Sequence, residues 1–123
     1  MDAADAESFA DSWERAWNSR DLDALLGHFE DDVLWTSPVA ARAIPGSGGV
    51  VRGKEALRAY YAMAGKDLHF DVVGVYAGVD IVVINYRNQR GSLVNEVLLF
   101  GSSGLVREGH GTYQGTEATT AIG

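Results

Sequence analysis

The stretch DALLGHFEDDVLWTSPV, residues 23–39, changes from a helical pattern to a strand pattern. Apolar side chains recur at helical spacing around its first part, at Leu22, Leu25, Leu26 and Phe29. After two acids, residues 33–37 alternate as a strand does, with Val33, Trp35 and Ser37 on one face. Pro38 ends this strand. We therefore predict a short helix capped by Asp21, then a strand whose last inward residue is Ser37.

Two further helices are predicted on either side of this stretch. Residues 6–17 place one apolar stripe along a helix, at Ala6, Phe9, Ala10, Trp13, Ala16 and Trp17. Residues 54–65, KEALRAYYAMAG, place Leu57, Tyr60, Tyr61 and Ala64 on one face and end at Gly65, a suitable C-cap residue. Residues 40–53, AARAIPGSGGVVRG, are rich in glycine and are predicted to form a loop.

The remainder of the chain is strand-like. Four segments, separated by turn signals, span residues 68–78, 79–88, 92–101 and 104–115. Consecutive hairpin-linked strands after three helices are typical of an α+β fold, with three N-terminal helices packed on a curved, mostly antiparallel mixed sheet. We predict a single domain over residues 1–123, in which the small and polar residues 116–123 form a frayed tail.

Composition excludes several classes of partner. The 123 residues carry a net charge of −7, which argues against nucleic acid and anionic membrane surfaces. The chain has no cysteine, and neither a signal peptide nor a spanning apolar run is visible. These features are typical of a cytoplasmic protein without disulfides.

Three segments together carry a family resemblance: residues 18–39, residues 52–62 (RGKEALRAYYA) and residues 95–106 (NEVLLFGSSGLV). They resemble the superfamily that contains nuclear transport factor 2, ketosteroid isomerase and the SnoaL-like polyketide cyclases. The likeness spans about residues 9–113. It implies a cone-shaped, barrel-like fold whose helices and sheet enclose a pocket for a small apolar molecule.

The resemblance also bears on three site residues. Ser37 stands where the isomerase has its aspartate base, and a serine alone does not take a proton from carbon near neutral pH, so isomerisation of ketosteroids by that route is not expected. Trp13 stands where the isomerase has a tyrosine donor, and an indole N–H donates without exchanging its proton. Glu96 corresponds to the isomerase's protonated aspartic acid.

Glu96 is the predicted general acid or base. It shares a strand face with Leu98 and Phe100, and an enclosed carboxyl in such a row should have a raised pKa. A register one residue off would place Asn95 inward instead. The register depends on the preceding turn.

Tyr86 shares the face of Glu96 only for one type of turn. If residues 89–91 form a three-residue turn with a glycine bulge, Asn88 pairs with Ser92 and Ile84 lies opposite Glu96. A two-residue turn would present Asn85 and Arg87 inward instead.

His110 is a second candidate for a catalytic residue. The resemblance places Gly109, Gly111 and Tyr113 toward the pocket, so His110 would line it only if a bulge at a glycine shifted the register.

The predicted substrate-binding residues are Ser37 and the aromatic residues of the inward stripes, namely Trp13, Trp17, Trp35, Tyr60, Tyr86 and Tyr113. Core packing is the alternative role for the aromatic residues. No metal-ligand spacing or phosphate-binding loop is visible, so we expect neither metal nor cofactor.

Three functions fit these observations. The first is a SnoaL-like isomerase or cyclase that needs no cofactor and transfers protons on an apolar or polycyclic substrate, with Glu96 as acid or base. The second is a protein that binds a small apolar or aromatic molecule without transforming it. The third is an assembly domain that forms a homodimer through the outer face of the sheet, where we expect Val94, Val97 and Leu99 to contribute apolar area. Dimerisation is also compatible with the other two functions.

Overall fold

The computed structural model describes residues 2–115, so the predicted frayed tail at residues 116–123 lies outside the described residues. Within residues 2–115 the chain forms four helices, α1 (Ala3–Ser19), α2 (Leu22–Leu26), α3 (Pro38–Ala43) and α4 (Lys54–Tyr61). It also forms six strands, β1 (Phe29–Thr36), β2 (Val50–Arg52), β3 (Asp71–Gly78), β4 (Ile81–Arg87), β5 (Leu93–Phe100) and β6 (Val106–Tyr113). The predicted α+β class is confirmed.

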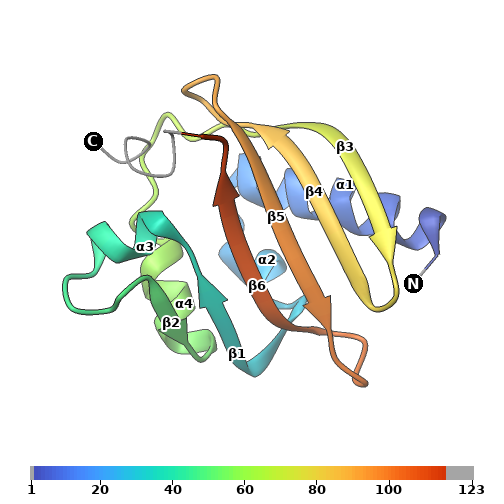
Figure 1. Cartoon of the computed structure of the whole chain (residues 1–123), viewed down its shortest axis with the longest axis horizontal. Helices are drawn as coiled ribbons and strands as arrows, with labels where there is room; N and C mark the ends of the chain where they lie inside the picture. The colour runs from blue at the N-terminus through green and yellow to red at the C-terminus, as the bar shows by residue number, and fades with distance from the viewer. Residues whose placement is uncertain (1, 116–123) are drawn as a thin grey trace.

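The six strands form one mixed sheet in the order β2-β1-β6-β5-β4-β3. Strands β1 and β6 are parallel, and every other neighbouring pair is antiparallel. Strands β2 and β3 are the two edges and do not pair with each other, so the sheet is open and not closed into the barrel-like form that the resemblance implied. Figure 1 shows α1 crossing behind the antiparallel part of the sheet, with α3 and α4 near β1 and β2.

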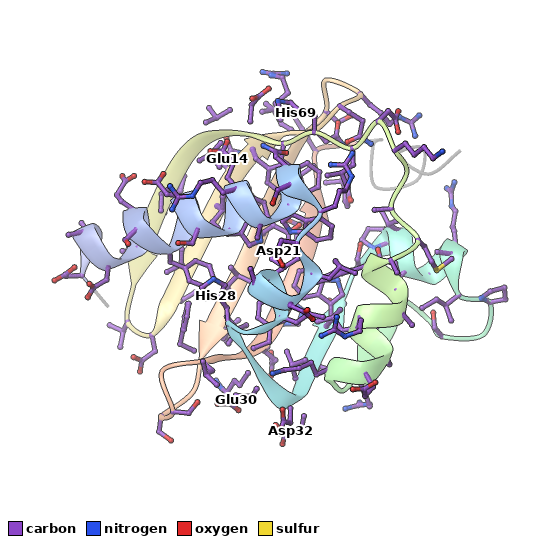
Figure 2. The ribbon with its side chains drawn as sticks, turned by 180° about the vertical axis from the view of Figure 1, so that it is seen from behind. Glu14, Asp21, His28, Glu30, Asp32 and His69 are labelled. Carbon is purple, nitrogen blue, oxygen red and sulfur yellow. The ribbon has the colours of Figure 1, made fainter. Side chains whose placement is uncertain are left out.

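Of the two predicted helix caps, Asp21 is confirmed, whereas Gly65 is wrong as the C-cap of the third helix, because α4 ends at Tyr61 with Ala62 as its C-cap. Asp21 Oδ1 accepts a 3.0 Å hydrogen bond from the backbone N–H of Ala24, which confirms Asp21 as the N-cap of α2. Helix α1 buries Ala6, Ala10, Trp13, Ala16 and Trp17, five of the six residues of the predicted stripe. Figure 2 shows the molecule from the helix side, with Glu14 of α1 toward β3, where its Oε2 accepts a 2.7 Å hydrogen bond from the backbone N–H of Val72.

The predicted loop at residues 40–53 is wrong in part. Pro38 begins α3 as well as ending β1, because its fixed φ and missing N–H suit the first turn of a helix. Ser37 is the N-cap of α3, and its Oγ accepts a 3.1 Å hydrogen bond from the backbone N–H of Val39. Further on, residues 50–52 form β2, which pairs antiparallel with β1.

The register of β5 follows the three-residue turn. The backbone N–H of Asn88 donates to the carbonyl of Ser92 at 3.0 Å, and Gly91 has a φ of 81°. Ile84 therefore pairs with Glu96, and Tyr86 lies on the face of Glu96. Both features confirm the prediction that depended on this turn.

The sheet has a helix-covered inner face and an outer face. On β5, Val94, Glu96, Leu98 and Phe100 are buried, whereas the side chains between them are half-buried or exposed. Val94 was expected on the outer face with Val97 and Leu99, but its even position places it with Glu96 instead.

None of the helices in residues 2–115 has the length and apolar character that a membrane-spanning helix requires.

Candidate functional site

A cavity of about 350 Å³ opens between the inner face of the sheet and the helices. This volume lies near the lower end of the range of small-molecule sites, about 300–1,000 Å³. Its walls are largely aromatic, formed by Trp17, Trp35, Tyr60, Tyr61, Phe70, Tyr86 and Tyr113. Other lining residues are Ser37, Val39, Ala43, Met63, Ala64, Gly65, Leu68, Asn88, Gln89, Arg90 and Glu96. An aromatic cavity of this size suits a small ring compound.

Glu96 is an acidic residue buried in this wall. Strand β5 turns its side chain toward the helices, and the residue is only 6% exposed. The hydroxyl of Tyr86 donates a 2.8 Å hydrogen bond to Oε1 of Glu96. Oε2 is buried without a hydrogen-bond partner among the described residues. One oxygen is thus bonded to Tyr86, whereas no residue of the described part of the chain bonds the other.

Burial raises the pKa of Glu96 from 4.5 to about 7, because the charged form loses its hydration. The hydrogen bond from Tyr86 opposes this shift, since it stabilises the carboxylate. A carboxyl with a pKa near neutrality has substantial populations of both the acid and the base form. The environment of Glu96 therefore suits proton transfer in either direction.

Tyrosine hydroxyls surround the carboxyl. Burial raises the pKa of Tyr60 to about 12, and the nearby charge of Glu96 adds to the shift, whereas a hydrogen bond with Ser37 opposes it. Burial and the charge of Glu96 also raise the pKa of Tyr113, and a hydrogen bond with Ser37 again opposes the shift. These phenols consequently stay protonated near neutral pH and can donate hydrogen bonds. Ser37 thus lies close to both tyrosines.

A second buried polar atom has no hydrogen-bond partner within residues 2–115. Nε1 of Trp35 is buried without a hydrogen-bond partner in the part of the chain that the structure describes. Trp35 lines the cavity together with Glu96. Because a buried N–H donor normally has a partner, this donor is a candidate ligand contact.

Two glycines of β6 shape the wall beside these groups. A Cβ atom at Gly109 would overlap the indole ring of Trp35, so glycine lets this ring lie against β6. At Gly111 a Cβ atom would lie 3.4 Å from Ser37 Oγ and 3.7 Å from Glu96 Oε1, which are ordinary contact distances. Gly109 is therefore required by packing, whereas Gly111 leaves a methyl-sized space.

Most of the predicted site residues lie together in the cavity wall, namely Glu96, Trp17, Trp35, Ser37, Tyr60, Tyr86 and Tyr113. Trp13 does not line the cavity. It is buried behind the wall, stacked on Phe70 with ring centroids 5.6 Å apart and tilted against Tyr86 at 5.1 Å. Trp13 therefore packs in the core behind the cavity wall and does not occupy the position of the predicted substrate contact.

His110 also lies outside the cavity, so its prediction as a catalytic residue of this pocket is wrong. Glycines 109 and 111 pair with Leu98 and Glu96 on the inner face, which turns His110 to the outer face beside Val97. There Nδ1 of His110 is 2.6 Å from Thr36 Oγ1, and Nε2 is 2.9 Å from Glu108 Oε2. The bulge in β6 falls between the partners of Leu99 and Phe100, too early in the strand to turn His110 inward.

Several lining residues were missed by the sequence reasoning. Phe70 precedes β3 and is held by the side-chain amide of Asn18 of α1. Nδ2 of Asn18 donates to the backbone carbonyl of Phe70 at 2.8 Å, and Oδ1 accepts from its backbone N–H at 2.9 Å. Asn88, Gln89 and Arg90 line the cavity from the β4–β5 turn. Among these missed residues, only Phe70 had a signal in the sequence, namely its alternation with Leu68 as in a strand. Residues 2–115 contain no group of three or more histidine, cysteine or acidic side chains that could hold a metal ion.

Residues 10–118 match the SnoaL-like domain family. A SnoaL-like protein of unknown function from Burkholderia thailandensis has a similar crystal structure, with 38% identity, a TM-score of 0.88, and coverage of 94% of this chain and 98% of that one. No curated protein matches the chain.

More distant structures share the fold. A candidate ketosteroid isomerase from Kribbella flavida aligns with a TM-score of 0.72 at 14% identity, over 88% of this chain and 76% of that one. A candidate isomerase of the SnoaL-like family from Agrobacterium tumefaciens aligns with a TM-score of 0.71 at 15% identity, over 89% and 97% of the two chains. At these identities the likeness concerns the fold and not the activity.

Proposed function

The chain belongs to the SnoaL-like domain family, and from this premise we propose that it is an enzyme that transfers protons on a small apolar ring compound without a cofactor. The observation that carries the proposal is the carboxyl of Glu96, a residue that lines the cavity, with Oε1 bonded to Tyr86 and Oε2 buried without a hydrogen-bond partner among the described residues. A buried, unpartnered carboxyl is costly to folding, and acid or base catalysis gives it a use.

In the proposed reaction, ionised Glu96 takes a proton from a carbon next to a carbonyl group through Oε2. The electron pair of the C–H bond moves onto the carbonyl oxygen and forms an enolate. Neutral phenols of Tyr60 and Tyr113, or the N–H of Trp35, are the available donors for the enolate oxygen. Glu96 then returns the proton to the same carbon or to a conjugated one, which exchanges or isomerises the substrate. Isomerisation and aldol-type cyclisation both begin with this step.

Aromatic walls favour a flat substrate. Tyr61 contacts both Trp17 and Trp35, with ring centroids 4.7 Å apart for Trp17–Tyr61 and 5.5 Å for Trp35–Tyr61. Such edge-to-face clusters offer apolar surface at a small entropic cost. The volume of about 350 Å³ favours a small ring system over a large polycyclic one.

Deuterium exchange tests the proposal without knowledge of the natural substrate. The wild-type protein is expected to accelerate deuterium incorporation next to the carbonyl of 2-tetralone in D₂O, followed by NMR. Glu96→Gln should lower the rate by about 10²–10⁴, the usual contribution of a general base. Glu55→Gln, the same change at an exposed residue of α4, is the matched control. Equal rates for Glu96→Gln and the wild type would overturn the proposal.

A binding protein is the second candidate function. Glu96 is the only carboxyl residue among the described residues that line the cavity, so an acid and a base on two separate carboxyls are not available. For this function, Glu96→Gln would change the affinity for a ligand, and the wild-type protein would show no exchange above the buffer rate with any ketone tested.

We further propose that the chain forms a homodimer through the outer face of the sheet. Tyr76, Val83 and Val97 pair across three neighbouring strands on that face, and Tyr76 is 63% exposed. A continuous apolar row of this kind favours association. Sedimentation should give a dimer that Val97→Asp converts to a monomer, and a wild-type monomer at high concentration would contradict this.

A further inference from the structure

The exposed residues of the cavity wall mark the mouth of the cavity. Most of the wall is buried or half-buried, whereas the exposed lining residues are Met63, Ala64, Gly65, Gln89 and Arg90. The mouth therefore lies between the residues that follow α4 and the turn that joins β4 to β5. Arg90 is the only positively charged residue among the described residues that line the cavity. A ligand that enters the cavity thus passes a positive charge at the mouth.

The turn that carries Arg90 is held by its own hydrogen bonds. Asn88 Oδ1 accepts from the backbone N–H groups of Arg90 and Ser92, both at 3.0 Å. The backbone N–H of Gly91 donates to the carbonyl of Asn88 at 2.9 Å. These bonds hold the backbone of Arg90 at the mouth, and its side chain extends from this fixed position.

The two charged residues that line the cavity lie at different depths. Arg90 is exposed, whereas Glu96 is buried in the wall. Ser92, just before β5, is four residues ahead of Glu96, which corresponds to about 13 Å along a strand. An ionised Glu96 repels an anion and Arg90 attracts one, so the two residues together favour one orientation of an anionic ligand.

We propose that the cavity takes ring compounds that bear a carboxylate on a short chain, with the rings against the aromatic wall and the carboxylate at Arg90. Arg90 is then a specificity-determining residue of the mouth. Because the chain carries a net charge of −7 and repels anions, such a ligand depends on a local positive charge. This inference rests on the ligand-binding part of the proposed function and names its ligand class.

Isothermal titration with 2-naphthylacetate and its uncharged amide, 2-naphthylacetamide, tests the inference. The two compounds have nearly the same shape and differ in charge. At pH 7 and low ionic strength, the wild type should bind the acid at least about threefold more tightly than the amide, within the range of an exposed ion pair. Added NaCl should reduce this preference and leave the affinity for the amide little changed. This comparison within the wild type keeps the inference falsifiable even if a variant does not fold.

Arg90→Gln should abolish the preference for the acid and leave the affinity for the amide within about twofold. The matched control is Arg52→Gln, the same change of charge at an exposed residue of the edge strand β2 that does not line the cavity, and it should keep the preference.

Equal wild-type affinities for the acid and the amide, or a preference that persists in Arg90→Gln, would overturn the inference. Binding of neither compound would overturn it together with the ligand-binding part of the proposed function. A preference for the acid that depends on Arg90, in a protein that shows no deuterium exchange, would support the inference and count against the proposed enzyme alone.

Discussion

Tyr86 and Glu96 form a buried pair in which the phenol donates a 2.8 Å hydrogen bond to one carboxyl oxygen, and the other oxygen has no partner within residues 2–115. The two residues lie on neighbouring strands, β4 and β5, and both face the cavity. Because Oε1 is already an acceptor, the proton of neutral Glu96 belongs on Oε2. In the proposed reaction, the pair thus determines which oxygen of Glu96 exchanges a proton with the substrate.

Folding stability should depend on pH through Glu96. Burial raises its pKa in the folded chain to about 7 from 4.5, so the unfolded chain releases this proton first as the pH rises. Its contribution to stability is complete below about pH 4.5 and is lost as the pH rises to about 7. The wild type should lose about 3 kcal/mol of unfolding free energy over this interval relative to Glu96→Gln, as measured by urea denaturation. A constant difference between the two proteins would contradict the raised pKa.

Tyr86→Phe should raise the pKa of Glu96 further. The Tyr86 hydrogen bond stabilises the carboxylate, and its loss also leaves Oε1 unsatisfied. We expect a loss of about 1–3 kcal/mol in stability near neutral pH and a shift of the exchange rate profile to higher pH. The pH dependence of deuterium exchange checks this. A shift to lower pH would show that Tyr86 does not act on the carboxylate.

Gly109 and Gly111 should respond differently to the same substitution. Gly109→Ala forces a methyl group into the ring of Trp35, so about 1–3 kcal/mol of stability should be lost. Gly111→Ala meets only ordinary contacts and should change stability by less than about 1 kcal/mol. Chemical denaturation of the two variants measures both values. Equal losses of stability in the two variants would mean that an added methyl group has no more room at Gly111 than at Gly109.

His110→Gln should leave proton transfer intact. His110 contacts Thr36 and Glu108 on the outer face, away from Glu96. Loss of these contacts should cost about 1 kcal/mol of stability, and deuterium exchange should stay within about twofold of the wild-type rate. A large fall in the deuterium exchange rate of a variant that still folds would show that His110 takes part in proton transfer.

The sequence could predict the inner position of Glu96 because a local signal determined the register. Gly91 supplies the positive φ that a three-residue turn requires, and this turn fixes the pairing of Ile84 with Glu96. The same alternation turned Tyr86 inward. Where residues of a turn determine the strand register, the sequence also predicts which side chains lie on the inner face of the sheet.

Other features depend on contacts that the sequence does not reveal. Helix α3 had a local signal, an N-cap serine followed by proline, but Pro38 also fitted the end of a strand. Strand β2 has three residues and forms only by pairing with β1, so no periodicity could indicate it. Trp13 and Trp17 share one helical stripe, yet only Trp17 reaches the cavity. An apolar stripe predicts which residues are buried, but it does not distinguish residues of the core from residues of the cavity wall.

Titration of Glu96 itself is the most direct test of the central claim, that this carboxyl is the acid or base of the cavity. The side-chain carboxyl carbon of Glu96, labelled with ¹³C and assigned by comparison with Glu96→Gln, can be followed by NMR across the pH range in which the protein is folded. We predict a midpoint of about 7, with the acid form dominant below it. A midpoint near the ordinary value of 4.5 would mean that the carboxyl is solvated, and it would contradict the claim.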